Sequence, residues 1–425
     1  MLKTLWLKIK SSDFAKNSLT LSAGVALAQV LPFLFYPLLG RIFTAEEFGL
    51  LATLTSITSV LAVLGSGKYE SGILIADNKL EAANLAVLSV CLGAVVMLLS
   101  WLLMQFVLLQ PLTTMLHEPD LPRWIYVCPV AAFSIIVFNV YNEWCVREKY
   151  FKALSVNKIV NSSAIALSKT FLGFVRLSSQ GLVVGDLAGR IISAVGCAVR
   201  ALLKDGHTFF QVTWCGMRSC AAKFKEFPIF TMPGQLLNTL GQAFPILLIG
   251  AFFNKTEVGY FSMAMTLFAI PINIISTALR DVYRQRANEE ILTQGHCIAS
   301  FDKLLTLLVL TGVGACLLLV WFLPQLMTLF LGPQWTVAGH YAQILAPAMV
   351  LSFIAGPLSG IFFVTDKLHQ FFYWQVLYAV TTLFSVLLGG WYFGTMEATL
   401  ILFSAFRGLT YLASILMTRR YARPA

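Results

Sequence analysis

A series of long apolar runs covers nearly the whole chain and limits how it can fold. Each run has about twenty mostly hydrophobic residues, the length that an α-helix needs to cross a bilayer. Short connections separate the runs, so we expect an all-α polytopic membrane protein with about twelve transmembrane helices. The expected spans are approximately 19–39, 49–67, 83–107, 123–142, 154–175, 181–203, 229–253, 258–279, 304–323, 338–364, 371–391 and 395–417.

The composition supports a membrane protein and excludes several other classes. Charged residues make up 12% of the 425 residues and hydrophobic residues 58%, whereas soluble domains have roughly a quarter charged residues. The eight cysteines include no CxxC pair, and the five histidines are scattered singly. We therefore expect no metal site and no cofactor. The sequence contains no GxxxxGK[ST] nucleotide-binding loop.

Lysine and arginine predict the orientation of the chain. If the N-terminus is cytoplasmic, the cytoplasmic segments hold 22 of these residues and the opposite side holds only Arg41, Arg123, Arg176 and Lys255. The positive-inside rule then places both termini in the cytoplasm. The net charge of +10 reflects this orientation and contact with anionic lipid, so no nucleic-acid partner is expected.

A long basic segment at the middle of the chain divides the spans into two sets of six. We interpret it as a linker between two lobes, although an ordinary cytoplasmic loop would look the same. The predicted organisation is a cytoplasmic amphipathic N-terminus at 1–18, an N-lobe at 19–203, a cytoplasmic linker at 204–228, a C-lobe at 229–417 and a cytoplasmic tail at 418–425.

The two halves share an internal repeat. The matching residues are Gln29, Pro32, Glu47 and Gly49 in the first half, and Gln242, Pro245, Glu257 and Gly259 in the second. They lie six spans apart, so the halves have parallel orientation and are expected to be related by a pseudo-two-fold axis along the membrane normal. Transporters built from such repeats bind their substrate between the halves, near the middle of the membrane.

Four basic residues fall inside the predicted spans, where a charge costs ~2.5–3.5 kcal/mol on the insertion scale. Lys158 and Lys169 are 11 residues apart, about three helical turns, and therefore share one helix face. Arg190 and Arg407 lie at similar depths in the last span of each half. Because guanidinium forms paired hydrogen bonds to phosphate, these four cations are candidates for binding an anionic substrate in a cavity between the lobes.

Other interpretations of these charges stay open. Arg190 could pair with Asp186 one turn away, and Arg407 could make a polar contact within the helix bundle. Asp186 is the one acid well inside a span, so it is also a candidate for binding a coupling ion, H⁺ or Na⁺.

A neutral polar stripe is predicted on the seventh span. Gln235, Asn238 and Gln242 have the i, i+3, i+7 spacing of one helix face. Amides on such a face could bind the hydroxyl groups of a sugar or hold neighbouring helices together.

Three stretches resemble motifs of the polysaccharide exporter and O-antigen flippase family. The stretches are Pro37–Gly49, the segment from Lys225 to Phe261 with its Glu-Val-Gly-Tyr-Phe end, and Leu331–Trp335. Residue by residue, the similarity extends to Arg41, Glu47, Gly49, Pro245, Gly259 and Trp335. The family belongs to the superfamily of multidrug, oligosaccharidyl-lipid and polysaccharide exporters.

The resemblance implies two six-helix lobes in a V-shape like that of multidrug exporters. It also implies a flippase that moves a polyprenyl-diphosphate-linked oligosaccharide across a bacterial plasma (inner) membrane, for polysaccharide or lipopolysaccharide (O-antigen) biosynthesis. Polymerase and glycosyltransferase proteins of that pathway would be its partners. A small-molecule exporter of the same architecture is the first alternative, and a membrane polysaccharide polymerase is the second. The second is disfavoured because the sequence has no large extramembrane loop and no DxD cluster.

Overall fold

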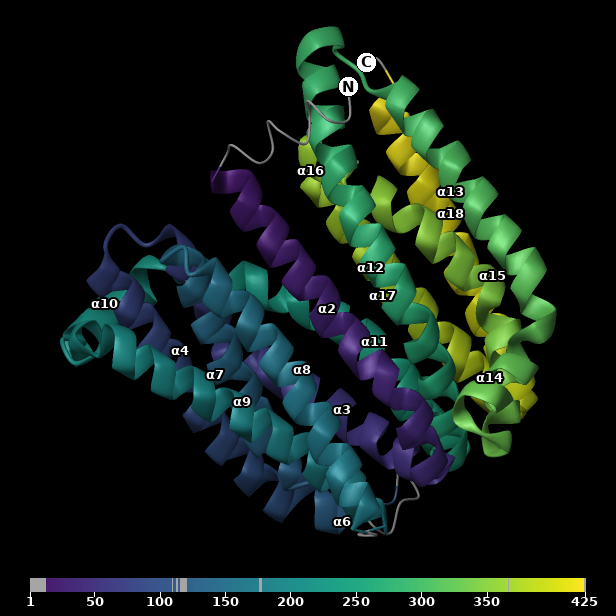
Figure 1. The fold of residues 1–425 in the computed structure, drawn as a ribbon, viewed down its shortest axis with the longest axis horizontal. Coiled ribbons are helices and arrows are strands. Elements are labelled where there is room, and N and C mark those ends of the chain that lie inside the picture. Colours follow the sequence, from purple (N-terminus) through teal and green to yellow (C-terminus); the bar gives the residue numbers. More distant parts are fainter. Residues whose placement is uncertain are drawn as a thin grey trace. The chain divides into compact units, whose positions relative to one another are not determined.

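The computed structural model describes residues 13–108, 110–111, 114, 121–175, 178–365 and 367–423, and every regular element within these ranges is a helix (Figure 1). Most of the predicted amphipathic N-terminus lies outside the described residues. The long helices of the first half are α2 (Asp13–Ile42), α3 (Ala45–Ser66), α4 (Lys79–Leu103), α7 (Val127–Arg147), α8 (Phe151–Phe174) and α9 (Ser178–Phe209). Those of the second half are α11 (Met232–Phe252), α12 (Lys255–Gln294), α13 (Ile298–Leu319), α15 (Thr336–Leu358), α17 (Leu368–Leu388) and α18 (Met396–Ala422).

Short helices connect or extend the long ones. Four are α-helical: α6 (Leu121–Trp124), α10 (Trp214–Lys223), α14 (Leu323–Leu331) and α16 (Ile361–Val364). Three are 3₁₀ helices, η1 (Tyr69–Ile75), η4 (Val320–Phe322) and η5 (Pro333–Trp335), and three are π-helical segments, η2 (Met104–Leu108), η3 (Phe227–Thr231) and η6 (Gly389–Phe393).

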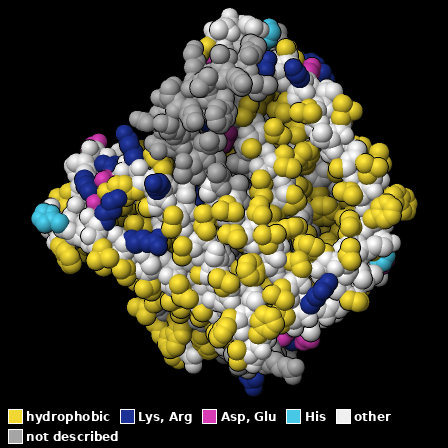
Figure 2. Space-filling view, viewed as in Figure 1, with side chains coloured by type: hydrophobic (Ala, Val, Ile, Leu, Met, Phe, Trp, Pro, Cys, Tyr) yellow, Lys and Arg dark blue, Asp and Glu magenta, His cyan; other side chains and the backbone are white. Residues whose placement is uncertain are grey.

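Ten helical segments within the described residues are long and apolar enough to cross a membrane. The 30-residue α2 and the 24-residue α8 also have spanning length, which brings the long helices to the predicted twelve. Large hydrophobic side chains such as Leu98, Leu318 and Leu409 are exposed on these helices, and yellow hydrophobic groups cover much of the face in Figure 2. Such a surface suits lipid, so the fold class predicted from the apolar runs is confirmed.

The described helices form two compact units. Unit 1 contains α2, the part of α3 from residue 54 onward, α4, α6 to α10 and the start of α11 up to residue 239. Unit 2 contains residues 44–53, which include the start of α3, the rest of α11, and α12 to α18. Helix α3 therefore begins in unit 2 and ends in unit 1. The lobe boundaries predicted from the linker stay a prediction.

Each unit has its own hydrophobic core. In unit 1 the core is built around Trp144, Leu85 and Ile73, all fully buried. In unit 2 it includes Phe301 and Leu358.

The region of the predicted linker is more helical than its composition indicates. Helix α9 continues past the expected end of the span to Phe209, with a non-helical backbone conformation at Asp205. A further helix, α10, follows, and Thr213 accepts a hydrogen bond from the Gly216 amide as its N-cap. The segment is therefore a folded part of unit 1.

Candidate functional site

A glycine-rich face of α9 places the intramembrane charges of unit 1 against α8. Gly181, Gly185 and Gly189 repeat every four residues and face the α8 backbone, so that a Cβ on Gly185 would lie 2.6 Å from the Lys169 Cα. Small residues at this spacing let two membrane helices approach closely. The GxxxGxxxG pattern of α9 is the sequence signal for this pairing.

Lys169, Asp186 and Arg190 form one ion-paired cluster, which we call the α8–α9 charge cluster. Asp186 Oδ1 lies 2.8 Å from Lys169 Nζ, and Asp186 Oδ2 lies 2.5 Å from Arg190 Nε. The Asp186 side chain is 8% exposed, whereas Lys169 is 15% and Arg190 20% exposed. One buried carboxylate therefore faces two cations, and the cluster keeps one net positive charge.

The structure thus combines two interpretations of Arg190. The guanidinium does pair with Asp186, as the alternative from helix spacing allows. However, the pair also includes Lys169, and both cations keep exposed surface. Both carboxylate oxygens of Asp186 therefore already have a cation as partner.

Lys158 is half-buried on α8, nearer the predicted cytoplasmic end than Lys169. It interacts electrostatically with Glu143 of α7. Asn157, the residue immediately before Lys158, accepts a hydrogen bond from Arg200 of α9. Unit 1 therefore holds three of the four predicted cations, Lys158, Lys169 and Arg190. Two carboxylates, those of Glu143 and Asp186, only partly balance their charge.

The polar stripe of the seventh span lies on α11 as predicted. Gln235 and Gln242 are exposed and Asn238 is half-buried. The division between the units falls between Asn238 and Gln242. Amide groups of this helix are therefore present in both units.

Arg407 occupies an aromatic cage inside unit 2. Its Cζ lies 4.8 Å from the Tyr378 ring centroid and 4.7 Å from that of Phe403. The residue is 6% exposed, and its Nε has no hydrogen-bond partner among the described residues. Trp374 fixes the neighbouring part of the cage by donating its Nε1 hydrogen to the Thr410 carbonyl at 3.0 Å. Cation–π contact therefore compensates part of the cost of burying this guanidinium.

The residues that resemble family motifs build two matching helix starts in unit 2. Thr44 caps α3 and exchanges hydrogen bonds with Glu47, while Asn254 caps α12 and accepts a bond from the Glu257 amide at 2.9 Å. Phe43 N–H donates to the Leu39 carbonyl, and Phe253 N–H makes the equivalent bond to Ile249. The turns match with an offset of 210 residues, three fewer than the offset of the Gln and Pro residues.

The two helix starts contact each other through glycine. A Cβ on Gly49 would overlap the Lys255 carbonyl oxygen, and a Cβ on Gly259 would overlap the Ala45 carbonyl oxygen. Lys255 Nζ also lies 2.7 Å from Glu46 Oε1. We call this contact the α3–α12 crossing.

A fully buried tryptophan supports the α3–α12 crossing. Trp335 contacts the Phe48 ring edge-on at 5.3 Å between centroids and the Tyr260 ring at 6.1 Å. Tyr341 donates a hydrogen bond to Glu257 at 2.5 Å. Motif residues that are almost 300 positions apart in the sequence therefore form one packed cluster. The motif residue Pro245 is buried within α11, and Arg41 lies in the last turn of α2 in unit 1.

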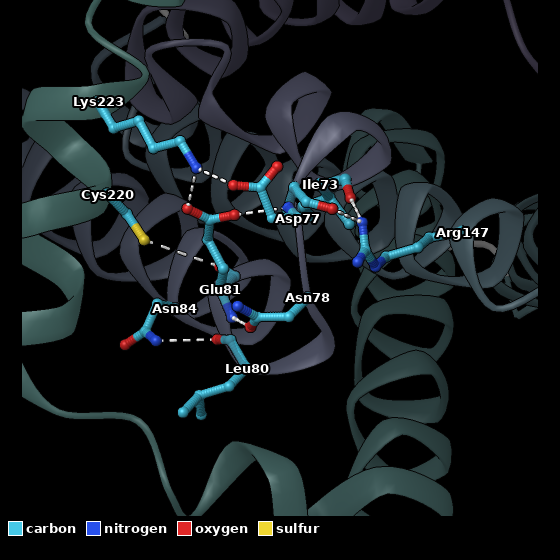
Figure 3. Close-up of polar contacts among 10 residues, drawn as sticks. Ile73, Asp77, Asn78, Leu80, Glu81, Asn84, Arg147, Cys220 and Lys223 are labelled. Carbon is cyan, nitrogen blue, oxygen red and sulfur yellow. Dashed lines mark hydrogen bonds and ion pairs between the residues drawn. The ribbon is translucent and has the colours of Figure 1, made fainter.

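A polar brace attaches α10 to the loop before α4 and to the first turn of α4 (Figure 3). Lys223 Nζ lies 2.6 Å from both Asp77 Oδ2 and Glu81 Oε1. This hydrogen bond and charge lower the pKa of Asp77 below its ordinary value. Nearby, Lys79 pairs with Asp205 at 2.6 Å, which raises the pKa of Lys79. Arg147 completes the region by donating hydrogen bonds to the Ile73 and Ala76 carbonyls.

These groups define the chemistry that the chain offers. The described residues include no group of histidine, cysteine and acidic side chains that could hold a metal ion. The features at membrane depth are instead cations, amides and aromatic rings. Long apolar helices that carry such groups, as in the described part of this chain, are typical of the membrane transporter class of protein.

Comparison with known proteins gives the family. Residues 38–340 match the model of the family described as "Polysaccharide biosynthesis protein". This chain belongs to that polysaccharide biosynthesis protein family.

Two curated relatives have related names. The chain is 22% identical over 325 residues to the "Succinoglycan biosynthesis transport protein ExoT" of Rhizobium meliloti (strain 1021), covering 74% of this chain and 62% of that protein. It is also 22% identical over 177 residues to the "Teichuronic acid biosynthesis protein TuaB" of Bacillus subtilis (strain 168), covering 40% and 35%. The matches therefore span less than two thirds of the length of either relative.

Solved structures have the same fold. The lipid II flippase MurJ in an inward closed conformation has a TM-score of 0.75 at 10% identity, covering 94% of this chain and 87% of MurJ. An inward-facing multidrug resistance MATE family transporter has a TM-score of 0.71 at 16% identity, covering 92% and 94%. The MATE-like fold expected from the motifs is confirmed.

Proposed function

We propose that this chain is a flippase that moves a polyprenyl-diphosphate-linked oligosaccharide from the cytoplasmic to the outer leaflet by alternating access. The cargo would serve surface polysaccharide or lipopolysaccharide biosynthesis. In this proposal the chain spans the bacterial inner membrane with both termini in the cytoplasm, as the distribution of Lys and Arg favours. It is a transporter and catalyses no covalent reaction.

The observation that carries the proposal is the excess of positive charge in the α8–α9 charge cluster. Two partly exposed cations and one buried carboxylate leave a net positive charge at membrane depth. A diphosphate could replace Asp186 as the partner of Arg190 and Lys169, because guanidinium and phosphate form paired, charge-assisted hydrogen bonds. Asp186 would then neutralise part of the site while no cargo is bound.

The remaining predicted residues have secondary roles in this proposal. Lys158 would attract the anionic head group nearer the cytoplasm. The amides of Gln235, Asn238 and Gln242 would bind sugar hydroxyl groups. Arg407 would act on the anion through its unpaired Nε, although its burial makes it a less direct candidate than Arg190.

Gene deletion with complementation tests the proposal. Cells that lack the gene should accumulate lipid-linked repeat units in the cytoplasmic leaflet and make no polymer on the surface. The wild-type chain should restore the polymer, whereas Lys169→Met/Arg190→Met should not, at equal protein abundance. Accumulation of repeat units in the outer leaflet would point to polymerisation instead. Normal polymer with ejection of small organic cations would favour the multidrug-type alternative.

A further inference from the structure

An apolar groove on unit 1 lies between three of its long helices. Helix α7 packs against both α4 and α9, and the three helices surround a cavity of about 220 Å³. Its floor on α7 is buried, whereas its walls on α4 and α9 are partly exposed. All the described side chains that line it are hydrocarbon or aromatic, among them Val87 and Val90 of α4, Val140 and Trp144 of α7, and Ala198 and Ala201 of α9.

The groove lies at the depth of one leaflet. Its α4 residues are about two to three helical turns from Lys79, the first residue of α4, and its α7 residues are within about three turns of Arg147, the last. In the orientation proposed above, both of these helix ends are cytoplasmic. Beside the groove on α9, Val195, Val199 and Leu202 are 55%, 48% and 53% exposed. Hydrocarbon of the cytoplasmic leaflet therefore faces the groove.

Charged groups of both signs gather at the cytoplasmic end of the groove. Lys79 Nζ lies 2.6 Å from Asp205 Oδ1 and 3.4 Å from Glu148 Oε2. Trp144, on the groove floor, donates its Nε1 hydrogen to Asp205 Oδ2 at 3.0 Å. The side chains of Lys79 and Glu148 are 43% and 19% exposed, so a ligand can reach both. One ammonium and two carboxylates therefore stand where the hydrocarbon wall ends.

This combination of charges favours one kind of lipid headgroup. A purely anionic headgroup would place its phosphate against Asp205 and Glu148, and like charges repel. A headgroup with a phosphate and a primary ammonium avoids this conflict, because its phosphate accepts hydrogen bonds from Lys79 while its ammonium donates to the carboxylates. A trimethylammonium headgroup has the same charges but no N–H to donate.

We propose that the groove between α4, α7 and α9 binds a phospholipid of the cytoplasmic leaflet with a primary ammonium headgroup, phosphatidylethanolamine. One acyl chain lies along Val90 and Ala198, the phosphate binds Lys79, and the ammonium binds Glu148 and Asp205. Because Asp205 has the non-helical backbone conformation within α9, the lipid also stabilises this bend. The leaflet follows from the orientation proposed above, but the site does not depend on the cargo.

Native mass spectrometry of the purified full chain tests the headgroup. Phosphatidylethanolamine, phosphatidylcholine and phosphatidylglycerol with identical acyl chains compete at equal concentration. We expect about fivefold more phosphatidylethanolamine than phosphatidylcholine to be retained, the effect of one hydrogen bond. Equal retention of the three lipids, or a preference for phosphatidylglycerol, would overturn the proposal.

Two variants address the two parts of the site. Glu148→Gln keeps the shape of the side chain but removes a carboxylate, so the selectivity over phosphatidylcholine should fall. Ala201→Phe fills the groove, so phosphatidylethanolamine should be retained no better than phosphatidylcholine.

The matched control fills a second apolar cavity, in unit 2. This cavity of about 340 Å³ lies between α12, α13 and α15, and none of the described residues that line it is charged. Ala315→Phe, on its α13 wall, should leave the lipid selectivity unchanged. Unchanged selectivity in both Glu148→Gln and Ala201→Phe, or its loss in Ala315→Phe, would overturn the assignment to unit 1.

Photochemical cross-linking locates the lipid in the wild-type chain and so does not depend on whether a variant folds. A phosphatidylethanolamine with a diazirine in its acyl chain should react within residues 86–90, 137–144 and 198–202. Excess phosphatidylethanolamine should suppress these products, and excess phosphatidylcholine should not. Products confined to other segments, or suppression by a polyprenyl phosphate, would overturn the proposal. Because no readout involves export, failure of the proposed transport function would leave these results unaffected.

Discussion

Gly49 and Gly259 each occupy the fifth position of a helix, and each lies against the carbonyl oxygen of the first residue of the other helix. The two positions are 210 residues apart in the sequence. In this reciprocal contact, equivalent positions of the internal sequence repeat occupy equivalent positions in the structure. It gives the small residues of the family motifs a physical role.

Alanine at either glycine should destabilise the protein. The added methyl group meets backbone, which cannot rotate away, and overpacking costs ~1–3 kcal/mol. We expect Gly49→Ala and Gly259→Ala to lower the midpoint of thermal unfolding of the purified protein. Gly314→Ala on α13 is the control because a Cβ there meets no atom within 4 Å. An unchanged midpoint for both crossing variants would contradict the close contact.

Removing cations from the α8–α9 charge cluster should weaken the binding of diphosphate. Lys169→Met/Arg190→Met should abolish binding of inorganic pyrophosphate to the purified protein in titration calorimetry. Arg190→Lys should keep part of the affinity, since it retains charge but loses the planar fork. Asp186→Asn should strengthen binding because it removes the competing carboxylate, while lowering thermal stability because two cations lose their partner. Equal affinity for all variants would place the anion site elsewhere.

The native Cys215 can test the proposed orientation. It is exposed on α10, and Cys220 of the same helix is 5% exposed and serves as an internal control. An impermeant maleimide should label Cys215 in inside-out vesicles and leave it unmodified in intact cells. Cys215→Ser should remove the signal. Labelling of Cys215 from outside intact cells would reverse the assigned topology.

Breaking the brace at Lys223 should release α10 without unfolding the spans. In Lys223→Met we expect faster amide hydrogen exchange in residues 214–223 and unchanged exchange in α7. Lys225→Met, which alters another exposed lysine two residues away, should leave exchange unchanged.

The brace should also respond to pH in one direction. Because Lys223 lowers the pKa of Asp77, their interaction stabilises α10 above the ordinary pKa of an aspartate. This stabilisation should be lost only as the pH falls through the lowered pKa of Asp77. Loss of protection in α10 already near neutral pH would contradict this assignment.

The sequence predicted the elements well because lipid imposes a length and a composition on each helix. Spans such as 83–107 and 395–417 correspond to α4 and α18 within a few residues. The partners of Lys169 and Arg190 depended on how α8 and α9 face each other, which the glycine spacing of α9 could have indicated. The cage around Arg407 could not be predicted, because Tyr378 comes from another helix and no local pattern connects them.

Sequence spacing also did not reveal which motif residues would meet. Phe48, Trp335 and Tyr260 are separated by whole helices, and only tertiary packing brings their rings together. The continuation of α9 beyond the predicted span includes Asp205. Its partners, Lys79 and Trp144, come from other helices, so no local pattern predicts these contacts.

The brace makes the segment between α9 and α10 a suitable site for inserting another domain. Residues 210–213 lie between one helix that is anchored in the core and another that Lys223 holds in place. A small folded domain fused there would be held at both ends, so it would not swing freely. A protein of this size, with little mass outside the membrane, could in this way carry a rigid marker for particle alignment in electron cryomicroscopy.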